Sequence, residues 1–233
     1  LDPIFSKTKP PINRKPYFIW SVQRKKGLKE IFSKLGLLEP VRMELREANT
    51  TRPILPKNWH DITLATVSYG YGMSVSLLHL AKAYAILGNG GFNIEPTILK
   101  KNHNSQARSR VLKKTTSDEM LKLLEAVVTD QRGTARILGS KYYRIGGKTG
   151  TAEKISLEKK GYQKDKVVAN FVGLFPLQEP RFVIAAFLDE PENNLLQEPC
   201  RYASCTVVPM VKKLIERTGP LMNVTPDNQA LMF

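Results

Sequence analysis

Apolar residues are densest in the second half of the chain, where two runs lie close together. Residues 167–175 (VVANFVGLF) and 182–188 (FVIAAFL) are almost continuously apolar and rich in β-branched and aromatic side chains, which is typical of buried strands. The connection between them centres on LQEP, and so short a connection favours antiparallel neighbours. The two runs therefore predict a β-hairpin.

A third strand is expected just before this hairpin. The segment RIGGKTGTAE (residues 144–153) has an apolar lead-in and a glycine pair. It predicts a strand over residues 148–152, at the edge of the sheet and next to residues 170–175. The polar and basic run of residues 154–166 is expected to connect this strand to the hairpin.

Helical spacing predicts helices before and after the strands. The first begins near Leu28 and stops at Gly36, and the second spans residues 75–87 before a GNGG segment. The third follows a capping box at residues 116–119 (TSDE), and the last begins near Val207. The predicted apolar faces are Leu28, Ile31, Phe32 and Leu35; Leu77, Leu80, Ala81 and Tyr84; Met120, Leu121, Leu124, Val127 and Val128; and Val207, Val208, Val211, Leu214 and Ile215. Together these elements predict an α+β domain with an antiparallel sheet flanked by helices.

The remaining segments divide the chain. Residues 1–27 are basic and contain several prolines, so they are expected to form an irregular arm. Residues 28–222 are expected to form the domain, and residues 223–233 a tail. Within the domain, residues 39–60 predict a long surface connection, and residues 132–135 (RGTA) predict a turn ahead of the first strand.

Composition narrows the class of protein. A chain of 233 residues with 42% hydrophobic content is long enough to bury a core as one domain. No apolar run approaches the roughly 20 residues of a membrane span, and the first residues lack the shape of a signal peptide. The first residue is not Met, so a piece of a longer protein is expected.

The net charge of +15 raises the question of nucleic-acid binding. The basic residues are spread over several segments, and neither a nucleic-acid fold motif nor aromatic–basic interleaving accompanies them. A solvated basic surface near anionic lipid headgroups or cell-wall polymer is therefore favoured over a nucleic-acid interface. Cys200 and Cys205 lie five positions apart, which leaves open a disulfide in an oxidising compartment or two free thiols.

Metal and cofactor chemistry is not expected. His60, His79 and His103 lie far apart and have no acidic or Cys partner at ligand spacing, so none of them is predicted to be catalytic or metal-binding. No cofactor is implied. Three aromatic residues upstream are expected to pack in the core or in loops rather than bind substrate: Trp59, Tyr69 and Tyr71.

The candidate chemistry lies in the tetrapeptide of residues 148–151. The Lys148 ammonium beside the hydroxyls of Thr149 and Thr151 offers a cation and donors to an anionic group. Gly150 lacks the Cβ that would keep a substrate backbone away from the strand, and an edge strand of this kind can bind a peptide by strand addition. The triplet alone also occurs by chance in ordinary strands, so its context decides.

Three other segments supply that context. These segments resemble, in the same order, parts of the class B penicillin-binding proteins, whose members include the division-specific peptidoglycan transpeptidases. They are residues 59–85 (from WHDITLATVSYGYGMSV into LLHLAKAYA), residues 170–176 (NFVGLFP) and residues 181–191 (RFVIAAFLDEP). The resemblance runs from about residue 28 to about residue 226. It implies part of a penicillin-binding transpeptidase fold, which is similar to that of serine β-lactamases.

The resemblance also implies roles for four residues. Lys148 would place positive charge beside a proton-shuttling hydroxyl, and Thr149 and Thr151 would bind the carboxylate of a substrate or β-lactam. Gly150 would lie along the substrate backbone, and the backbone N–H of Thr151 would supply half of an oxyanion hole. The catalytic candidates are Lys148 and Thr151, and the substrate-binding candidates are Thr149, Gly150 and Thr151.

The chain departs from this family in the motifs that carry the nucleophile. The family uses Ser-x-x-Lys and Ser-x-Asn, and no Ser-x-Asn occurs anywhere in the sequence. Ser-x-x-Lys occurs at Ser6 and Ser156, but neither match has the expected setting at the start of a buried helix upstream. We therefore identify no nucleophile, expect the resemblance to cover only the C-terminal part of the domain, and leave catalysis by this chain undecided.

Three functions are weighed. The first is the C-terminal part of a serine-type peptidoglycan D,D-transpeptidase, and the second is a non-catalytic module that binds cell-wall peptide or a division partner. The third and weakest is a nucleic-acid binder. The expected partners are peptidoglycan stem peptide, penicillin and other β-lactams, the missing N-terminal half and other division proteins, with no nucleic acid. The expected location is the periplasmic face of the bacterial inner membrane, as part of an anchored full-length protein.

Overall fold

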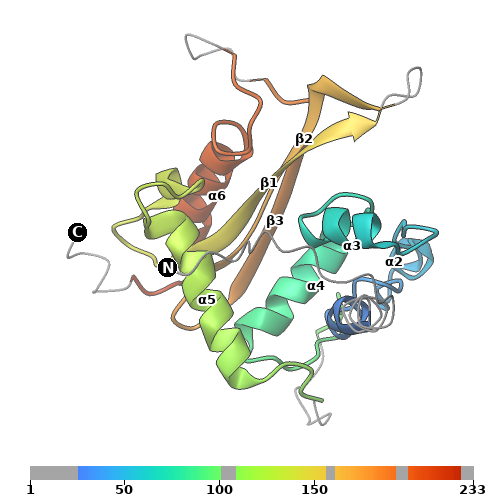
Figure 1. Cartoon of the computed structure of the whole chain (residues 1–233). Helices are drawn as coiled ribbons and strands as arrows, with labels where there is room; N and C mark the ends of the chain where they lie inside the picture. Colours follow the sequence, from blue (N-terminus) through green and yellow to red (C-terminus); the bar gives the residue numbers. More distant parts are fainter. Residues whose placement is uncertain (1–25, 101–108, 156–160, 193–198, 227–233) are drawn as a thin grey trace, which may run out of the picture.

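The computed structural model describes residues 26–100, 109–155, 161–192 and 199–226 (Figure 1). Almost all of the expected basic arm lies outside these residues, as do residues 227–233 of the expected tail. Both Ser-x-x-Lys matches, at Ser6 and Ser156, also lie outside them. The described part contains helices and one antiparallel sheet, which agrees with the predicted α+β class.

Three antiparallel strands form one sheet in the order β1-β2-β3. Lys148 lies opposite Val172. The predicted hairpin is therefore confirmed, as is the prediction that residues 148–152 lie at the sheet edge beside residues 170–175. The strand bounds are Gly146–Ile155 for β1, Tyr162–Phe175 for β2 and Phe182–Asp189 for β3.

The first two strands are longer than predicted, because β1 continues to Ile155 and β2 begins at Tyr162. The expected polar connection over residues 154–166 is wrong at both ends. Beyond a register shift between Glu153 and Lys154, the two strands form a ribbon that extends past the helices (Figure 1). Backbone pairing holds this ribbon in solvent, so its residues do not need the apolar pattern that identifies a buried strand.

One face of the sheet is covered by α6 (Val207–Leu221). Its buried valines pack against a group of side chains that includes Ala169, Phe171 and Phe175 from β2. Four of the five predicted apolar residues of this helix are buried, but Leu214 is 47% exposed. Leu214 lies at the margin of the stripe that the i, i+4 and i+8 positions turn toward the sheet.

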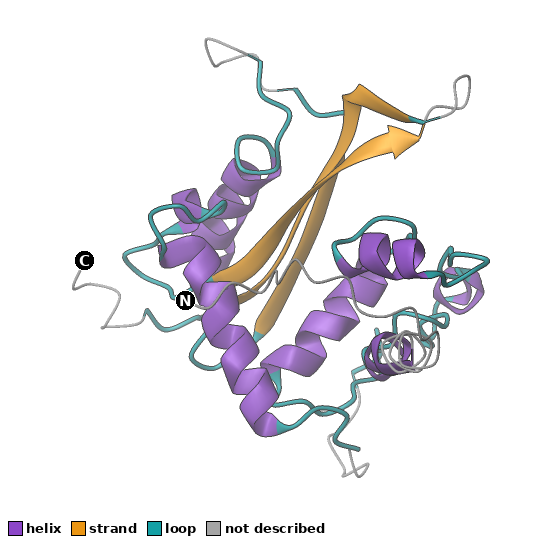
Figure 2. Cartoon of the chain, in the orientation of Figure 1, coloured by secondary structure: helices purple, strands orange, loops and turns teal. Residues whose placement is uncertain are grey.

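The other face carries α4 (Leu77–Gly88) and α5 (Lys114–Thr129), so that the strands run between two sets of helices (Figure 2). Leu124 of α5 packs with Leu174 of β2 and with Leu177, and Tyr84 of α4 lies against this group. The prediction that the third helix packs on the sheet is confirmed.

The buried face of α4 differs from the prediction. The buried residues are His79, Ala83, Ile86 and Leu87, whereas the four predicted residues of that helix are only partly buried. The buried set has the i, i+4, i+7, i+8 spacing of a helical stripe. The prediction left out a histidine from an apolar face, and burial of His79 is possible because both ring nitrogens are hydrogen-bonded.

The predicted capping box at residues 116–119 is also wrong. α5 begins at Lys114, and its N-cap residue Lys113 makes no side-chain capping hydrogen bond. Ser117 therefore lies inside the helix, where it is completely buried and donates its hydroxyl hydrogen to the Leu87 carbonyl at the end of α4. Thr116, the predicted N-cap residue, therefore lies within the first turn of α5 rather than at its cap.

The shorter elements complete the fold. Residues 26–34 are helical and end at Gly36, whose φ of +74° suits glycine, as predicted. The expected surface connection contains α2 (Arg46–Thr50), which has no buried residue, and it leads to α3 (Asp61–Ser68). η1 (Arg136–Leu138) follows the predicted turn. Among the described helices, none combines the length and the apolar character that crossing a membrane requires.

Candidate functional site

The candidate site lies on β1, at the outer edge of the sheet. Thr149 and Thr151 are two positions apart, so their side chains share one face of the strand. Their partners on β2 are Phe171 and Ala169, both completely buried on the α6 side. The two hydroxyls therefore lie at the rim of the core that α6 covers.

Each hydroxyl has a partner from another part of the chain. Thr149 Oγ1 lies 2.7 Å from Thr134 Oγ1, and either hydroxyl can donate in this pair. Thr151 Oγ1 accepts a hydrogen bond of 3.1 Å from the backbone N–H of Ala203. The turn before η1 and the turn before α6 thus flank the motif on β1.

The backbone of β1 also presents donors at this edge. The N–H of Glu153 donates to the Tyr71 hydroxyl at 3.1 Å, so it points away from β2. In an antiparallel pair, residues two apart direct their backbone groups to the same side. The N–H groups of Thr149 and Thr151 therefore also point outward, where an added peptide strand would find them.

Lys148 lies on the opposite face of the strand from the two hydroxyls. Its side chain is exposed, and its ammonium donates to the Thr149 carbonyl at 2.8 Å, which brings the positive charge around to the edge. In the described part of the chain, no serine hydroxyl is hydrogen-bonded to Lys148. The role beside a proton-shuttling hydroxyl stays a prediction.

The glycines of the motif make room for side chains of β2. A Cβ on Gly147 would overlap the ring of Phe171 and lie 2.7 Å from the Val172 carbonyl oxygen. A Cβ on Gly150 would lie 2.6 Å from Asn170 Oδ1. Glycine is therefore required at position 150 to leave room for Asn170 on the face of the sheet. This requirement is separate from the predicted role of Gly150, which is to admit a substrate backbone at the edge.

Charge at the far end of β1 is compensated within the protein. The Lys154 ammonium lies 3.0 Å from Asp189 Oδ1 and 2.7 Å from Glu190 Oε1. Hydrogen bonds to Glu190 and Asp189 raise the pKa of Lys154, and the hydrogen bond from Lys154 lowers the pKa of Glu190. Lys154 is therefore engaged, and Lys148 is the cation of the motif that faces solvent.

Sequence reasoning missed two contributors, Thr134 and the Ala203 backbone. Thr134 lies in the predicted RGTA turn, but its contact with Thr149 depends on how that turn meets β1. Tyr71 was assigned to packing, and it does pack edge-on against Tyr162 at 5.3 Å, while it also holds the Glu153 amide. The described residues contain no group of three or more His, Cys, Asp or Glu side chains that could hold a metal ion, and His103 lies outside them.

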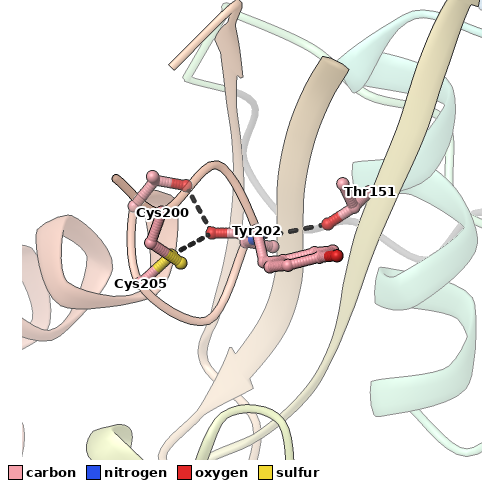
Figure 3. Close-up of a disulfide and its surroundings, with 6 residues drawn as sticks. Thr151, Cys200, Tyr202 and Cys205 are labelled. Carbon is pink, nitrogen blue, oxygen red and sulfur yellow. Dashed lines mark hydrogen bonds between the residues drawn. A yellow bond between two sulfur atoms is a disulfide. The ribbon is translucent and has the colours of Figure 1, made fainter. Parts of the chain in front are cut away.

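The two cysteines form a disulfide. Cys200 and Cys205 are joined with a Cα–Cα distance of 6.2 Å, and they enclose the turn from which Ala203 donates to Thr151 (Figure 3). Of the two alternatives that the spacing left open, the bridge is the one found in the structure.

This fold and this strand edge define the class of protein as a penicillin-binding transpeptidase domain. A family model described as the penicillin binding protein transpeptidase domain matches residues 23–215. The chain belongs to this family.

Particular relatives narrow the assignment. A probable peptidoglycan D,D-transpeptidase FtsI from Caulobacter vibrioides is 34% identical over 203 residues, which are 84% of this chain and 34% of that protein. A probable peptidoglycan D,D-transpeptidase PenA from Neisseria flavescens is 32% identical over 170 residues, which are 73% of this chain and 40% of that protein. The chain thus spans about a third of the length of the curated relatives it matches.

Solved structures agree with this assignment. The transpeptidase domain of penicillin-binding protein 3 from Burkholderia pseudomallei superposes with a TM-score of 0.75 at 33% identity, covering 87% of this chain and 59% of that one. Penicillin-binding protein 3 from Mycobacterium tuberculosis, in complex with ampicillin, has a TM-score of 0.71 at 24% identity, covers 85% of this chain and 46% of that one, and supports the fold alone. The predicted fold class is confirmed.

Proposed function

We propose that this chain is the carboxyl-side part of a peptidoglycan D,D-transpeptidase that cross-links the cell wall in division, and that the outer edge of β1 binds the stem peptide and β-lactams. One observation carries this proposal. The Lys148 ammonium, the hydroxyls of Thr149 and Thr151 and the outward N–H groups of the same two threonines occur together at one edge of the described sheet. Such an edge supplies main-chain pairing for a peptide and donors for its carboxylate.

The nucleophile is proposed to come from a Ser-x-x-Lys segment outside this chain. The two matches in this sequence lack the expected setting, and both lie outside the described residues. Acyl transfer requires that serine, its lysine and the Ser-x-Asn motif beside the β1 edge. A separate polypeptide, made from the part of the Burkholderia transpeptidase domain that carries both motifs, is the direct way to supply them.

Labelling with a fluorescent penicillin tests this arrangement. We expect no labelled band from this chain alone and a band on the supplied polypeptide when the two are mixed. Lys148→Ala should reduce the band from the mixture. Labelling of this chain alone would contradict the proposal and would make Ser6 or Ser156 the nucleophile.

Reversible binding can be measured without a nucleophile. Isothermal calorimetry with ampicillin should show binding that Lys148→Ala weakens by about 1.5–3 kcal/mol, because a charge-assisted contact with the carboxylate is lost. Lys141→Ala, which removes another exposed lysine upstream of β1, is the matched control and should leave the affinity unchanged. Equal affinities for the Lys148 variant and the wild type would remove Lys148 from the site.

A non-catalytic binding module is the second candidate, favoured by the absence of a convincing Ser-x-x-Lys segment. In that case the β1 edge would hold cell-wall peptide or a division partner without turning it over. Two results together would favour the binding module over the enzyme. Ampicillin would still bind this chain, and the supplied polypeptide would not restore penicillin labelling.

We further propose that the chain works at the periplasmic face of the inner membrane, beside other division proteins. The Cys200–Cys205 disulfide supports this location, because disulfides persist in oxidising compartments and are rare in the reducing cytosol.

A further inference from the structure

The turn of residues 200–205 lies directly against the binding edge of β1 (Figure 3). Its ends are joined by the Cys200–Cys205 disulfide, and its middle is anchored by Ala203, which is 1% exposed and belongs to the core on the α6 side. The backbone N–H of Ala203 donates to Thr151 Oγ1 at 3.1 Å. The turn therefore has a covalent closure, a buried anchor and one polar contact with the motif.

Hydrogen bonds fix the shape of this turn. The Tyr202 carbonyl accepts from the Cys205 N–H at 3.2 Å and from Thr206 Oγ1 at 2.8 Å. Cys205 Sγ also lies 3.0 Å from the Tyr202 carbonyl oxygen. This contact is not a hydrogen bond, because the sulfur is in the disulfide and carries no hydrogen. The Ala203 carbonyl accepts from the Val208 N–H at 3.0 Å, which ties the turn to α6.

The direction of the Ala203 bond decides what the Thr151 hydroxyl can do. A hydroxyl has one hydrogen to donate and can also accept, whereas a backbone N–H can only donate. Thr151 Oγ1 must therefore accept from Ala203, which leaves the hydroxyl hydrogen for another acceptor. An ionised carboxylate is an acceptor only, so it matches this hydrogen. The hydroxyls of Thr149 and Thr134 differ, because either of them can be the donor in their pair.

We propose that the disulfide-closed turn is a positioning device that presents the Thr151 hydroxyl as a hydrogen-bond donor to the carboxylate of the ligand. Ala203, Cys200 and Cys205 act through Thr151 and do not touch the ligand themselves. This inference rests on the proposed function, since it assumes that Thr151 meets the carboxylate. It assigns the disulfide to the binding site rather than to the stability of a remote loop.

Ampicillin, which carries a carboxylate, is the probe, and NMR titration of the full chain gives its dissociation constant. Thr151→Val should weaken binding about tenfold, the effect of one good hydrogen bond to a charged group. The paired change Cys200→Ser and Cys205→Ser should weaken it by about three- to tenfold. Ser204→Ala, an exposed change in the same turn, is the matched control and should have no effect.

A double-mutant cycle separates positioning from a general structural role. In the Thr151→Val background, removal of the disulfide should cause no further loss of affinity. A loss of equal size in both backgrounds would overturn the proposal. Ampicillin methyl ester, whose neutral carbonyl is a weaker acceptor than a carboxylate, should lose less affinity on removal of the disulfide. Chemical reduction of the wild-type disulfide should weaken ampicillin binding to the same extent as the two serine substitutions. This measurement replaces the serine variant if that variant does not fold.

Amide hydrogen exchange tests the contact without any ligand. The Ala203 amide should exchange faster in Thr151→Val, because its acceptor is gone, and faster again when the disulfide is removed. Unchanged exchange at Ala203 would overturn the inference even if ampicillin binds. If the wild type binds no ampicillin, the proposed function fails, while faster exchange at Ala203 would still support the turn as the element that orients Thr151.

Discussion

His79 is almost completely buried on α4, and its hydrogen bonds define the tautomer of the neutral ring. Its Nε2 lies 3.0 Å from the Glu39 carbonyl oxygen, which can only accept, so Nε2 carries the hydrogen. Its Nδ1 lies 2.7 Å from Ser76 Oγ and accepts in the neutral ring. Burial lowers the pKa of His79 from its usual 6.5. Burial therefore favours the neutral ring in the folded state.

This burial predicts a loss of stability in mild acid. Below pH 6.5 the unfolded chain binds a proton at His79, whereas the folded chain binds it only at a lower pH. The free energy of unfolding should therefore decrease as the pH falls from 6.5 toward the pKa of His79 in the folded state. The slope contributed by this one group is at most about 1.4 kcal/mol per pH unit. Urea unfolding at a series of pH values should show a shallower slope for His79→Gln than for the wild type. The same change at the exposed His60 should leave the slope as it is, and parallel curves for all three proteins would exclude His79 as the cause.

Gly147 offers a second test at a single residue. Gly147→Ala should lower the free energy of unfolding by about 1–3 kcal/mol, because the added methyl group overlaps the buried Phe171 ring and the Val172 carbonyl. Gly27→Ala is the control, since a Cβ there meets nothing within 4 Å. Chemical denaturation of both variants measures the difference, and a Gly147 variant as stable as the wild type would mean that Phe171 can move without loss.

At the residue scale, the sequence predicts the part of the site that is contiguous. Lys148, Thr149, Gly150 and Thr151 are candidates because of their chemistry and order together with the resemblance of the segments around them. Thr134 and Ala203 are not, because their contribution depends on which turns lie against β1. A backbone N–H such as that of Ala203 has no residue-type signal at all.

At the scale of elements, predictions held where one local pattern dominates. The β2–β3 hairpin was predicted because both strands are buried and continuously apolar. The face of α4 was not predicted, because a tertiary hydrogen bond to the Glu39 carbonyl allows His79 to be buried. The start of α5 was not predicted either, because no capping side chain marks it. The ribbon beyond Glu153 was missed because exposed pairing leaves no apolar signature.

The junction of α5 and β1 can be tested through its ion pair. Arg144, just before β1, donates from Nε and from one terminal nitrogen to the two oxygens of Glu125, at 2.7 and 2.8 Å. Glu125→Gln should lower the melting temperature, with a loss of stability of about 1 kcal/mol, because the pair is bidentate and partly buried. Asp118→Asn breaks the exposed pair with Lys114 and is expected to change stability by less than about 0.5 kcal/mol. Equal effects of the two changes would show that the bidentate geometry adds nothing.

At the scale of the whole molecule, part of the sheet is left open within the described residues. β3 is the last strand of the described sheet, and Phe187, on the same face as Lys148 and Asn170, is 52% exposed. Open strand edges and exposed aromatic side chains promote association. The chain on its own should therefore self-associate as its concentration rises.

Sedimentation velocity over a range of concentrations measures this association. Phe187→Lys should shift the distribution toward monomer, because it places a charge on the open face. Leu221→Lys adds the same charge at the end of α6, where the side chain is 81% exposed, and should have a smaller effect. A chain that sediments as a monomer at every concentration would show that this face does not associate.

The hydrogen bond between the Tyr71 hydroxyl and the Glu153 amide has a consequence for ligand length. Outward amides recur at every second residue of β1, and Tyr71 already occupies the one at Glu153. A strand added as proposed would pair with the amides of Thr151 and Thr149 but not with that of Glu153, whose hydrogen is already bonded to the Tyr71 hydroxyl. The proposed ligand would therefore pair over a short stretch of β1 and leave the edge before Glu153.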